Sequence, residues 1–349
     1  MPFLSATTCS SSASGKHPVL PFRGPTKLVL KFRGEKEEGT CKYGAFGKAG
    51  SGMEQVSSDA FHVKHSHLFS FRYCNSTIFW GIIGFALHFY KKKGCASMAK
   101  RIAIVNQKGG VGKTTTCVNL ASALHSQGKR VLVCDFDPQA NATSGLGVDK
   151  TTATPSVYEV LIEGVPCKRA IVPTPHCDVL PVNKALAGAG IEMIGIPDRE
   201  HLLKKALDSV AEEYDYILID CPPSLELLTL NGLCAADSVL VPVQCEYYAL
   251  EGLSDLLGTV RIVKRSLNPG IELEGVLLTM YDSRTNLSMQ VSEEVKRHFP
   301  GQVYATVIPR TVRLSEAPSH GKPIDAYDPY SRGTEAYRNL ASEIIAGNT

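Results

Sequence analysis

The sequence predicts an α/β fold in which helices cover both faces of a doubly wound, mostly parallel sheet. Two observations predict this fold. Short apolar runs of the kind found in buried parallel strands alternate regularly with helical stretches over residues 98–349. The first run leads through a glycine-rich turn into an amphipathic helix, which is the order of elements around a phosphate-binding loop. With 44% hydrophobic and 20% charged residues, the 349-residue chain has enough apolar material for a large core.

Residues 1–97 differ in charge from the rest of the chain, and we place a domain boundary after them. They hold 13 Lys and Arg against 5 Asp and Glu, a net charge of +8, whereas residues 98–349 have a net charge of −5. Residues 1–60 are rich in Ser, Gly, Lys and Thr without a sustained period, so this extension is expected to be largely disordered. Because the convincing strands begin directly after Met98, a mis-assigned start is the alternative.

One apolar run in the extension, residues 77–89, is followed by three lysines. A spanning helix needs about 20 apolar residues, so the run is too short to cross a membrane. A peripheral membrane anchor stays open as an alternative. The eleven cysteines contain no C-x-x-C pair, and those after residue 97 lie mostly in apolar runs. They are expected to be reduced and buried, which indicates a cytoplasmic protein.

The strand expected at residues 101–105 runs into the segment NQKGGVGKTTT, residues 106–116, and then into a helix that ends near Ser126. Glycines let backbone N–H groups converge on phosphate oxygens, and the helix N-terminus adds partial positive charge. Lys113 is expected to reach the β- and γ-phosphates, and the Thr114 hydroxyl is expected to bind Mg²⁺. The chain is therefore predicted to be a P-loop NTPase. The expected nucleotide contacts in this loop are Gly109, Gly110, Val111, Gly112, Lys113, Thr114 and Thr115.

Two further expected strands, residues 131–135 and 216–220, each end in an aspartate. Carboxyl ends of parallel strands meet at one sheet edge, so Asp135, Asp137 and Asp220 are placed near Mg²⁺ or the attacking water. The apolar run before Asp220 matches a Walker B strand, and this carboxylate is expected to hold Mg²⁺ through water. Three more strands are expected at residues 238–243, 275–280 and 303–308.

These motifs together resemble the ParA/Soj chromosome- and plasmid-partition branch of the deviant Walker A ATPases. The segments that carry the resemblance lie between residues 99 and 346: NQKGGVGKTTT, DFDPQANATSGLG, ILIDCPPSL, EYYALEGL and IPRTVRLSEAPSHGKPI. The loop departs from the standard Walker A pattern, because Gln107 stands where glycine is usual and Lys108 is an additional lysine.

The resemblance implies an Mg²⁺-dependent ATPase that converts ATP and water to ADP and phosphate. It implies an ATP-sandwich homodimer that binds DNA non-specifically, associates with the nucleoid and hydrolyses ATP when a ParB-like partner stimulates it. Lys108 would act across the two-fold interface on the partner's nucleotide, much as an arginine finger does. Asp137 would position the hydrolytic water, and Asp135 would lie near the metal.

The resemblance also implies contacts with adenine and with DNA. Pro309 and Arg310 match the positions at which the family contacts adenine, and no guanine-type N-K-x-D motif is present. Arg261 and Arg284 match positions that contact DNA phosphates. Arg261, Lys264 and Arg265 are spaced i, i+3 and i+4, so they share one helix face. A solvated basic face is the alternative for this group.

Three other functions stay open. A MinD-like membrane-cycling ATPase would end in a basic amphipathic helix, but residues 336–349 contain Arg338 and no later Lys or Arg, so membrane binding is not expected. Electron transfer through a bridging cluster would need interface thiolates, for which Cys221 and Cys234 are the candidates. A sporulation or transcription regulator could use the same nucleotide switch.

Overall fold

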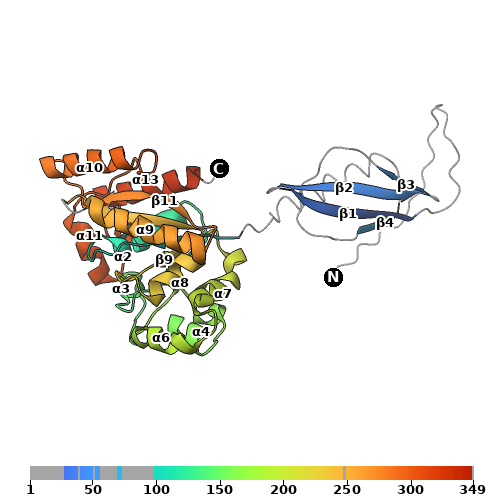
Figure 1. Cartoon of the computed structure of the whole chain (residues 1–349), viewed down its shortest axis with the longest axis horizontal. Coiled ribbons are helices and arrows are strands. Elements are labelled where there is room, and N and C mark those ends of the chain that lie inside the picture. The colour runs from blue at the N-terminus through green and yellow to red at the C-terminus, as the bar shows by residue number, and fades with distance from the viewer. Residues whose placement is uncertain are drawn as a thin grey trace. The chain divides into compact units, whose positions relative to one another are not determined.

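The computed structural model describes residues 98–246 and 249–347, together with four strands between residues 27 and 72. The chain divides into two compact units, Met1–Ser97 and Met98–Thr349 (Figure 1). In the first unit, an antiparallel sheet has the order β3-β2-β1-β4. Its strands are β1 (Lys27–Glu37), β2 (Thr40–Ala49), β3 (Gly52–Gln55) and β4 (Phe69–Arg72). The expected disorder of the extension otherwise falls outside the described residues, as does the apolar run 77–89.

The second unit is built on a sheet with the order β11-β10-β5-β9-β6-β8-β7. Every neighbouring pair in it is parallel except β7 with β8, so the predicted doubly wound, mostly parallel sheet is confirmed. The strands are β5 (Lys100–Ile104), β6 (Val131–Asp135), β7 (Val172–Pro173), β8 (Asp178–Leu180), β9 (Tyr216–Asp220), β10 (Ser238–Gln244) and β11 (Glu272–Thr279). The short strands β7 and β8 were not predicted.

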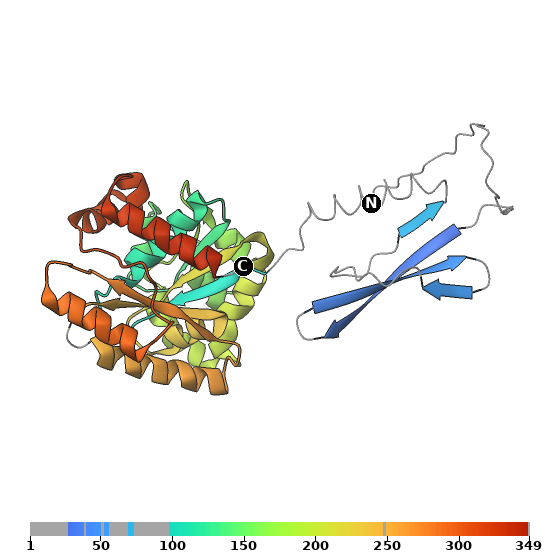
Figure 2. The same ribbon diagram turned by 90° about the horizontal axis from the view of Figure 1, so that it is seen from above.

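Both faces of this sheet are buried, because alternate residues of each strand enter two different cores. Ala103 of β5 packs in one core with residues of α4, α6, α7, α8, α9 and α10. Ile102 and Ile104 pack in the other core with residues of α2, α3, α11, α12 and α13. Figure 2 shows the red C-terminal helices and the orange helices on opposite sides of the sheet. Continuous apolar strands are the expected consequence of covering a parallel sheet on both faces.

The helices that cover the sheet are α2 (Lys113–Ser126), α3 (Asn141–Gly145), α4 (Val157–Ile162), α5 (Cys167–Ala170), α6 (Leu186–Glu192), α7 (Leu202–Asp208), α8 (Leu227–Ala235), α9 (Ala249–Ser266), α10 (Asn286–His298), α11 (Val312–Glu316), α12 (Ile324–Tyr327) and α13 (Arg332–Ala346). Within the described residues, none of the helices combines the length and the apolar character that a membrane crossing requires.

The strand predicted at residues 303–308 is wrong. This segment runs beside β11 but makes only isolated bridges, such as Val276 with Val303. The interruption has a clear cause, because the Glu343 carboxylate on α13 accepts hydrogen bonds from the backbone N–H groups of Ala305 (3.0 Å) and Thr306 (2.8 Å). Those donors are therefore lost to strand pairing.

The strand register brings the predicted site to one sheet edge. Asp220 at the end of β9 is opposite Ile104 of β5 on one side and Asp135 of β6 on the other. β10 adds to the other side of β5, with Leu240 opposite Ile104. The loop after β5 and the two aspartates therefore start from adjacent strands.

Tight packing behind this edge leads to a stability prediction. A Cβ on Gly232 of α8 would lie 2.7 Å from the Cys221 sulfur, which is buried directly after β9. Gly232→Ala is therefore expected to lower the free energy of unfolding by about 1–3 kcal/mol through overpacking, despite the better helix propensity of alanine. Urea denaturation measures this change.

The matched control is Gly258→Ala in α9, where a Cβ would meet no atom within 4 Å. That substitution is expected to raise the free energy of unfolding by up to about 1 kcal/mol, because alanine is the better helix former. A Gly232→Ala protein as stable as the Gly258→Ala protein would contradict the packing argument.

Candidate active site

The glycine-rich loop between β5 and α2 has the backbone that the sequence predicts. Gly110 and Gly112 have φ angles of 75° and 93°, a left-handed region in which glycine carries no steric cost. A Cβ at Gly109 or Gly110 would meet no atom within 4 Å, so the space beside the loop backbone is open. Backbone N–H groups here can approach a phosphate without obstruction.

Two buried side chains hold this loop in place. The Asn106 side-chain amide donates to the Pro242 carbonyl (2.8 Å), and its oxygen accepts from the Lys108 N–H (2.9 Å). The Thr279 hydroxyl at the end of β11 donates to the Val111 carbonyl (2.8 Å). Both residues are 5% exposed or less. The loop is thus fixed from β10 and β11 before any ligand binds, and sequence reasoning missed both residues.

Lys113 begins α2 and is only 7% exposed. Its Nζ donates to the Lys108 carbonyl at 3.2 Å. Burial lowers the pKa of this lysine, while the negative charges of Asp220 and Asp137 oppose that shift. The structure therefore brings the predicted phosphate lysine close to two of the three predicted carboxylates.

The Asp220 carboxylate is fully buried, and neither of its oxygens has a hydrogen-bond partner among the described residues. Burial and the neighbouring Asp135 raise the pKa of Asp220 well above its usual range, against the opposing effect of the Thr114 hydroxyl and Lys113. A buried carboxylate without partners fits a cation-binding role, since a cation removes the penalty of burial.

The chemistry of the neighbouring groups narrows the kind of cation. In the described part of the chain there is no cluster of three or more His, Cys, Asp or Glu residues that could bind a metal by itself. A metal beside Asp220 would complete its coordination with the Thr114 hydroxyl, ligand phosphates and water. That mixed shell is typical of Mg²⁺ in nucleotide sites.

The other two aspartates differ in their surroundings. Asp135 is completely buried, and its oxygens accept hydrogen bonds from Thr143 and from the Asp137 N–H (3.3 Å). Burial raises the pKa of Asp135 to about 6, although these hydrogen bonds oppose the shift. Asp137 is 8% exposed, and its Oδ1 accepts from the Gln139 N–H at 3.0 Å.

Lys108 lies apart from these buried groups. It is exposed, and its Nζ is 2.7 Å from Oε2 of Glu246, just beyond β10. Both side chains of this pair are more than 40% exposed, and such pairs stabilise a protein by about 0–1 kcal/mol. Lys108 can therefore leave Glu246 at little cost.

The segment predicted to contact adenine joins the same sheet edge. The Arg310 N–H donates to the Tyr281 carbonyl at 3.1 Å, and Pro309 forms an isolated bridge with Tyr281. Tyr281 lies two residues beyond Thr279, which contacts the loop. Between them, Met280 adopts a left-handed φ of 50°, which is uncommon for a residue other than glycine.

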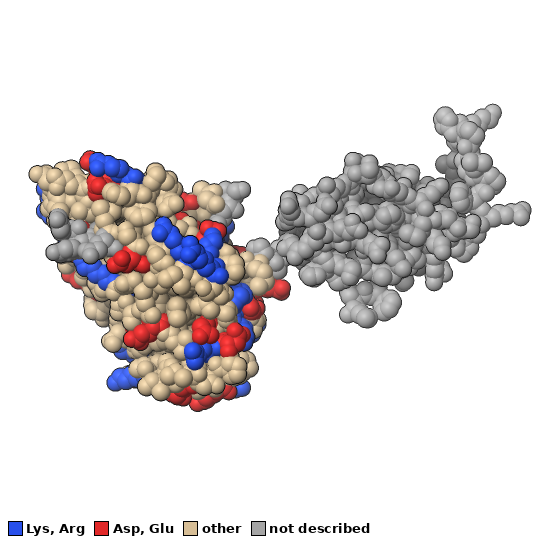
Figure 3. Space-filling model, viewed as in Figure 1, with Lys and Arg blue, Asp and Glu red and all other residues tan. Residues whose placement is uncertain are grey.

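The basic side chains predicted to bind DNA are exposed but not equivalent. Lys and Arg gather over α9 on the face in Figure 3. Arg284 forms two hydrogen bonds with Asp282 (2.7 and 2.9 Å), and Lys264 lies 2.5 Å from Glu272. Arg261 and Arg265 have no ion pair within the part of the chain that the structure describes. Of the four side chains predicted to bind DNA, the two without an ion pair among the described residues therefore both lie on α9.

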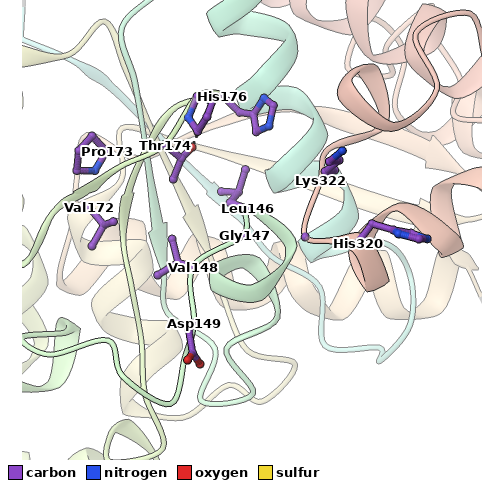
Figure 4. A pocket seen from close by; sticks show the side chains of 12 residues that line it. Leu146, Gly147, Val148, Asp149, Val172, Pro173, Thr174, His176, His320 and Lys322 are labelled. Carbon is purple, nitrogen blue, oxygen red and sulfur yellow. Dashed lines mark hydrogen bonds between the residues drawn. The ribbon is translucent and has the colours of Figure 1, made fainter.

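A cavity of about 450 Å³ lies elsewhere, between the end of α3, the β7–β8 hairpin and residues His320 to Lys322 (Figure 4). None of the predicted nucleotide-binding residues lines it.

Cys221 and Cys234, the two candidate ligands of a bridging cluster, are poorly suited to form thiolates. Burial raises the pKa of Cys234 to about 11 and raises that of Cys221 further, so neither favours the electron-transfer alternative.

Known proteins resemble most of this chain. A model of the AAA domain family matches residues 99–273. The sporulation initiation inhibitor protein Soj of Bacillus subtilis is 60% identical over 251 residues, which cover 71% of this chain and 99% of Soj. The chromosome partitioning protein ParA of Myxococcus xanthus is 52% identical over 260 residues, 74% of this chain and 92% of that protein.

Among solved structures, the cobyrinic acid a,c-diamide synthase of Mycobacterium smegmatis, with bound ADP and magnesium, is similar to this chain. The two are 41% identical with a TM-score of 0.63, over 71% of this chain and 94% of the synthase. A nucleotide and magnesium therefore occupy a relative of the same fold.

The buried charge of Asp220 leads to a prediction about pH. Because the pKa of Asp220 is raised in the folded state, ionisation of this carboxyl destabilises the nucleotide-free protein. The resulting loss of free energy of unfolding grows as the pH rises above 3.8, the pKa of the carboxyl in the unfolded state. Asp220→Asn removes the charge and keeps the shape. We expect the variant to exceed the parent by at least about 1 kcal/mol in free energy of unfolding at pH 8, with the difference vanishing near pH 4.

Urea denaturation across this pH range measures the difference. The control is Asp149→Asn, since hydrogen bonds from Thr151 lower the pKa of Asp149 and predict the opposite trend, a less stable variant at pH 8. An Asp220→Asn protein that is less stable than the parent at pH 8 would disprove the unfavourable burial of this charge.

Proposed function

This chain belongs to the ParA/Soj family of chromosome-partitioning ATPases, and from that premise we propose that it hydrolyses ATP to ADP and phosphate as the nucleotide switch of a DNA-partition system. The observation that carries the proposal is the buried Asp220 carboxylate, which has no hydrogen-bond partner among the described residues and lies beside Lys113 and the open glycine-rich loop. This is the arrangement that a metal-bound triphosphate would complete.

Nucleotide binding is assigned to the glycine-rich loop and the edge that follows β11. Backbone N–H groups of the loop would face the phosphates. Lys113 would replace its hydrogen bond to the Lys108 carbonyl with contacts to the β- and γ-phosphates. Thr114 would hold Mg²⁺ directly and Asp220 would hold it through water, with Asp135 nearby. When bound, Mg²⁺ neutralises charge on the phosphates. Pro309 and Arg310 lie at the adenine end of the site.

Hydrolysis needs an oriented water rather than a covalent intermediate. Asp137 is the residue we assign to this task, because its carboxylate is close enough to act on the Lys113 charge and lies at the same edge. Fixing the water in line with the γ-phosphate lowers the barrier through positioning. Lys113 stabilises the negative charge on the transferring group.

Lys108 completes the site of a second subunit. Lys113 is assigned to the phosphates within its own chain, whereas the Lys108 side chain is exposed and, in the part of the chain that the structure describes, is paired only with Glu246. Supplying its charge across a two-fold interface would make ATP the link between two subunits. The active form is then a homodimer.

DNA binding follows from the cations on α9. Arg261 and Arg265 are exposed without ion pairs among the described residues, and Lys264 and Arg284 extend the same contact once their carboxylate partners are displaced. Residues 98–349 carry a net charge of −5, so one subunit binds weakly and a dimer doubles the contact. Such binding is independent of sequence and falls steeply with salt.

The partner expected to trigger hydrolysis is a ParB-like protein, and the ATP-bound dimer is expected on nucleoid DNA rather than on membranes. The similarity to the sporulation inhibitor Soj supports a second role for the same switch, in which the dimer regulates transcription. Both roles use the same nucleotide-gated contact with DNA.

The contribution of Lys108 to dimerisation is tested with Lys108→Ala. With ATP and Mg²⁺, the parent is expected to run as a dimer in size-exclusion chromatography with light scattering. The variant is expected to dimerise at least about 10-fold more weakly, because a lost phosphate contact in a water-excluded site costs more than about 1.4 kcal/mol. Lys168→Ala removes another exposed lysine, which is paired with Glu213, and is expected to match the parent. Equal dimerisation of both variants would refute the role of Lys108.

DNA binding is tested by replacing Arg261 and Arg265 together with alanine. Co-sedimentation with duplex DNA in ATP is expected to weaken by about 10-fold or more. The slope of log affinity against log salt is expected to fall by about 4 per dimer, because the two subunits together lose four phosphate contacts. The control replaces Lys168 and Arg169, which removes the same charge from α5. Equal weakening by both pairs would show that net charge, rather than the α9 face, controls binding.

A further inference from the structure

Asp135 is placed where a metal ligand is expected, yet its carboxylate is already engaged by the protein. Its Oδ2 accepts two hydrogen bonds of 2.7 Å, one from the Thr143 N–H and one from the Thr143 hydroxyl. Its Oδ1 accepts from the Asp137 N–H at 3.3 Å. The carboxylate therefore connects the end of β6 both to the next loop and to helix α3.

Thr143 is the other half of this connection. The side chain is completely buried on α3, and its hydroxyl both donates to Asp135 and accepts from the Val182 N–H at 3.1 Å. Val182 lies two residues beyond β8, the next strand in the sheet. One hydroxyl thus links α3 to two neighbouring strand ends and uses its donor and an acceptor to do so.

The far end of α3 is fixed by close backbone packing. A Cβ on Gly147 would lie 3.0 Å from the Gly321 carbonyl, and both glycines have left-handed φ angles, 81° and 61°. Figure 4 shows this end of α3 beside the segment that contains His320 and Lys322. The helix is consequently held at both ends and has little room to shift.

Asp137 lies in the short loop between the two anchored points, Asp135 and Thr143. The loop turns tightly, because the Ala140 N–H donates to the Asp137 carbonyl at 2.8 Å and Ala140 itself has a left-handed φ of 56°. A non-glycine residue persists in that conformation when its surroundings hold it there. The hydrogen bonds between Asp135 and Thr143 close this loop.

From these contacts we propose that Thr143 is a positioning residue for ATP hydrolysis. Its hydroxyl holds the Asp135 carboxylate, and the pair fixes the loop that presents Asp137 to the phosphate loop. The Thr143 hydroxyl is engaged by Asp135 and Val182, so it acts through the loop that carries Asp137. This inference rests on the proposed ATPase function and assigns a role to Thr143, which lies within the segment DFDPQANATSGLG but was given no role from the sequence.

The test compares Thr143→Val, which keeps the shape and loses the hydroxyl, with Thr143→Ser, which keeps the hydroxyl. We expect kcat of Thr143→Val to fall by about 10- to 100-fold, since small misplacements of a catalytic group carry costs of that size. The Kd for ATP and the KM should stay within about 3-fold of the parent, because the phosphate loop is untouched. Thr143→Ser is expected to keep most of the activity.

The matched control is Thr334→Val. Thr334 is 1% exposed and its hydroxyl donates to the Asp328 carbonyl at 2.7 Å, so this variant loses a buried hydroxyl far along the chain, on α13. It should be destabilised in urea much as Thr143→Val is, with kcat within about 2-fold of the parent. If Thr143→Val does not fold, Thr143→Ala removes the same hydroxyl without adding volume.

A double-mutant cycle with Asp137→Ala separates positioning from a general structural effect. If Thr143 acts through Asp137, adding Thr143→Val to Asp137→Ala should leave the residual rate unchanged within about 2-fold. Losses that multiply would overturn the inference, and so would a Thr143→Val protein as active as the parent. A parent that binds ATP without hydrolysing it would instead overturn the proposed function, and this inference with it.

Discussion

The rest of the site is arranged around the burial of negative charge at one edge of the sheet. Asp135 and Asp220 are adjacent in register and completely buried, and the fold accommodates them in different ways. Asp135 is satisfied by Thr143 and the loop backbone, whereas Asp220 has no hydrogen-bond partner among the described residues and relies on nearby Lys113. A charge buried in that state costs several kcal/mol. The unliganded fold therefore favours a cation at this position.

This arrangement divides the site into fixed and movable parts. Asn106 and Thr279 hold the loop from β10 and β11, while Thr143 holds the Asp137 loop from the other side of β9. The Lys108 side chain is the exception, since among the described residues it is bound only through an exposed pair with Glu246. The fixed parts are suited to bind and orient a nucleotide within one subunit, and the exposed lysine is suited to reach another.

The elements that could be predicted from the sequence are those that a local pattern of residues determines. β6 and β9 were predicted to the residue, because parallel strands covered on both faces form unbroken apolar runs that end where the polar edge begins. Features that depend on contacts between residues far apart in the chain could not be predicted in this way. Residues 303–308 are not a strand because Glu343, more than 30 residues away, accepts the N–H groups of Ala305 and Thr306. Likewise, the contacts of Asn106 with Pro242 and of Thr279 with Val111 join residues over 100 positions apart in the chain.

The proposed completion of each active site by the Lys108 of a second subunit can be tested by mixing two inactive variants. In a heterodimer of Lys108→Ala with Asp137→Ala, one site keeps Asp137 and receives the intact Lys108, while the other site has neither. At subunit concentrations that saturate dimerisation of both variants, mixing equal amounts should therefore restore ATP hydrolysis to about a quarter of the parent rate per subunit, since half of the dimers are mixed and each has one intact site. A mixture that forms mixed dimers yet is no more active than its two components would place Lys108 in its own subunit's site and contradict its action across the interface.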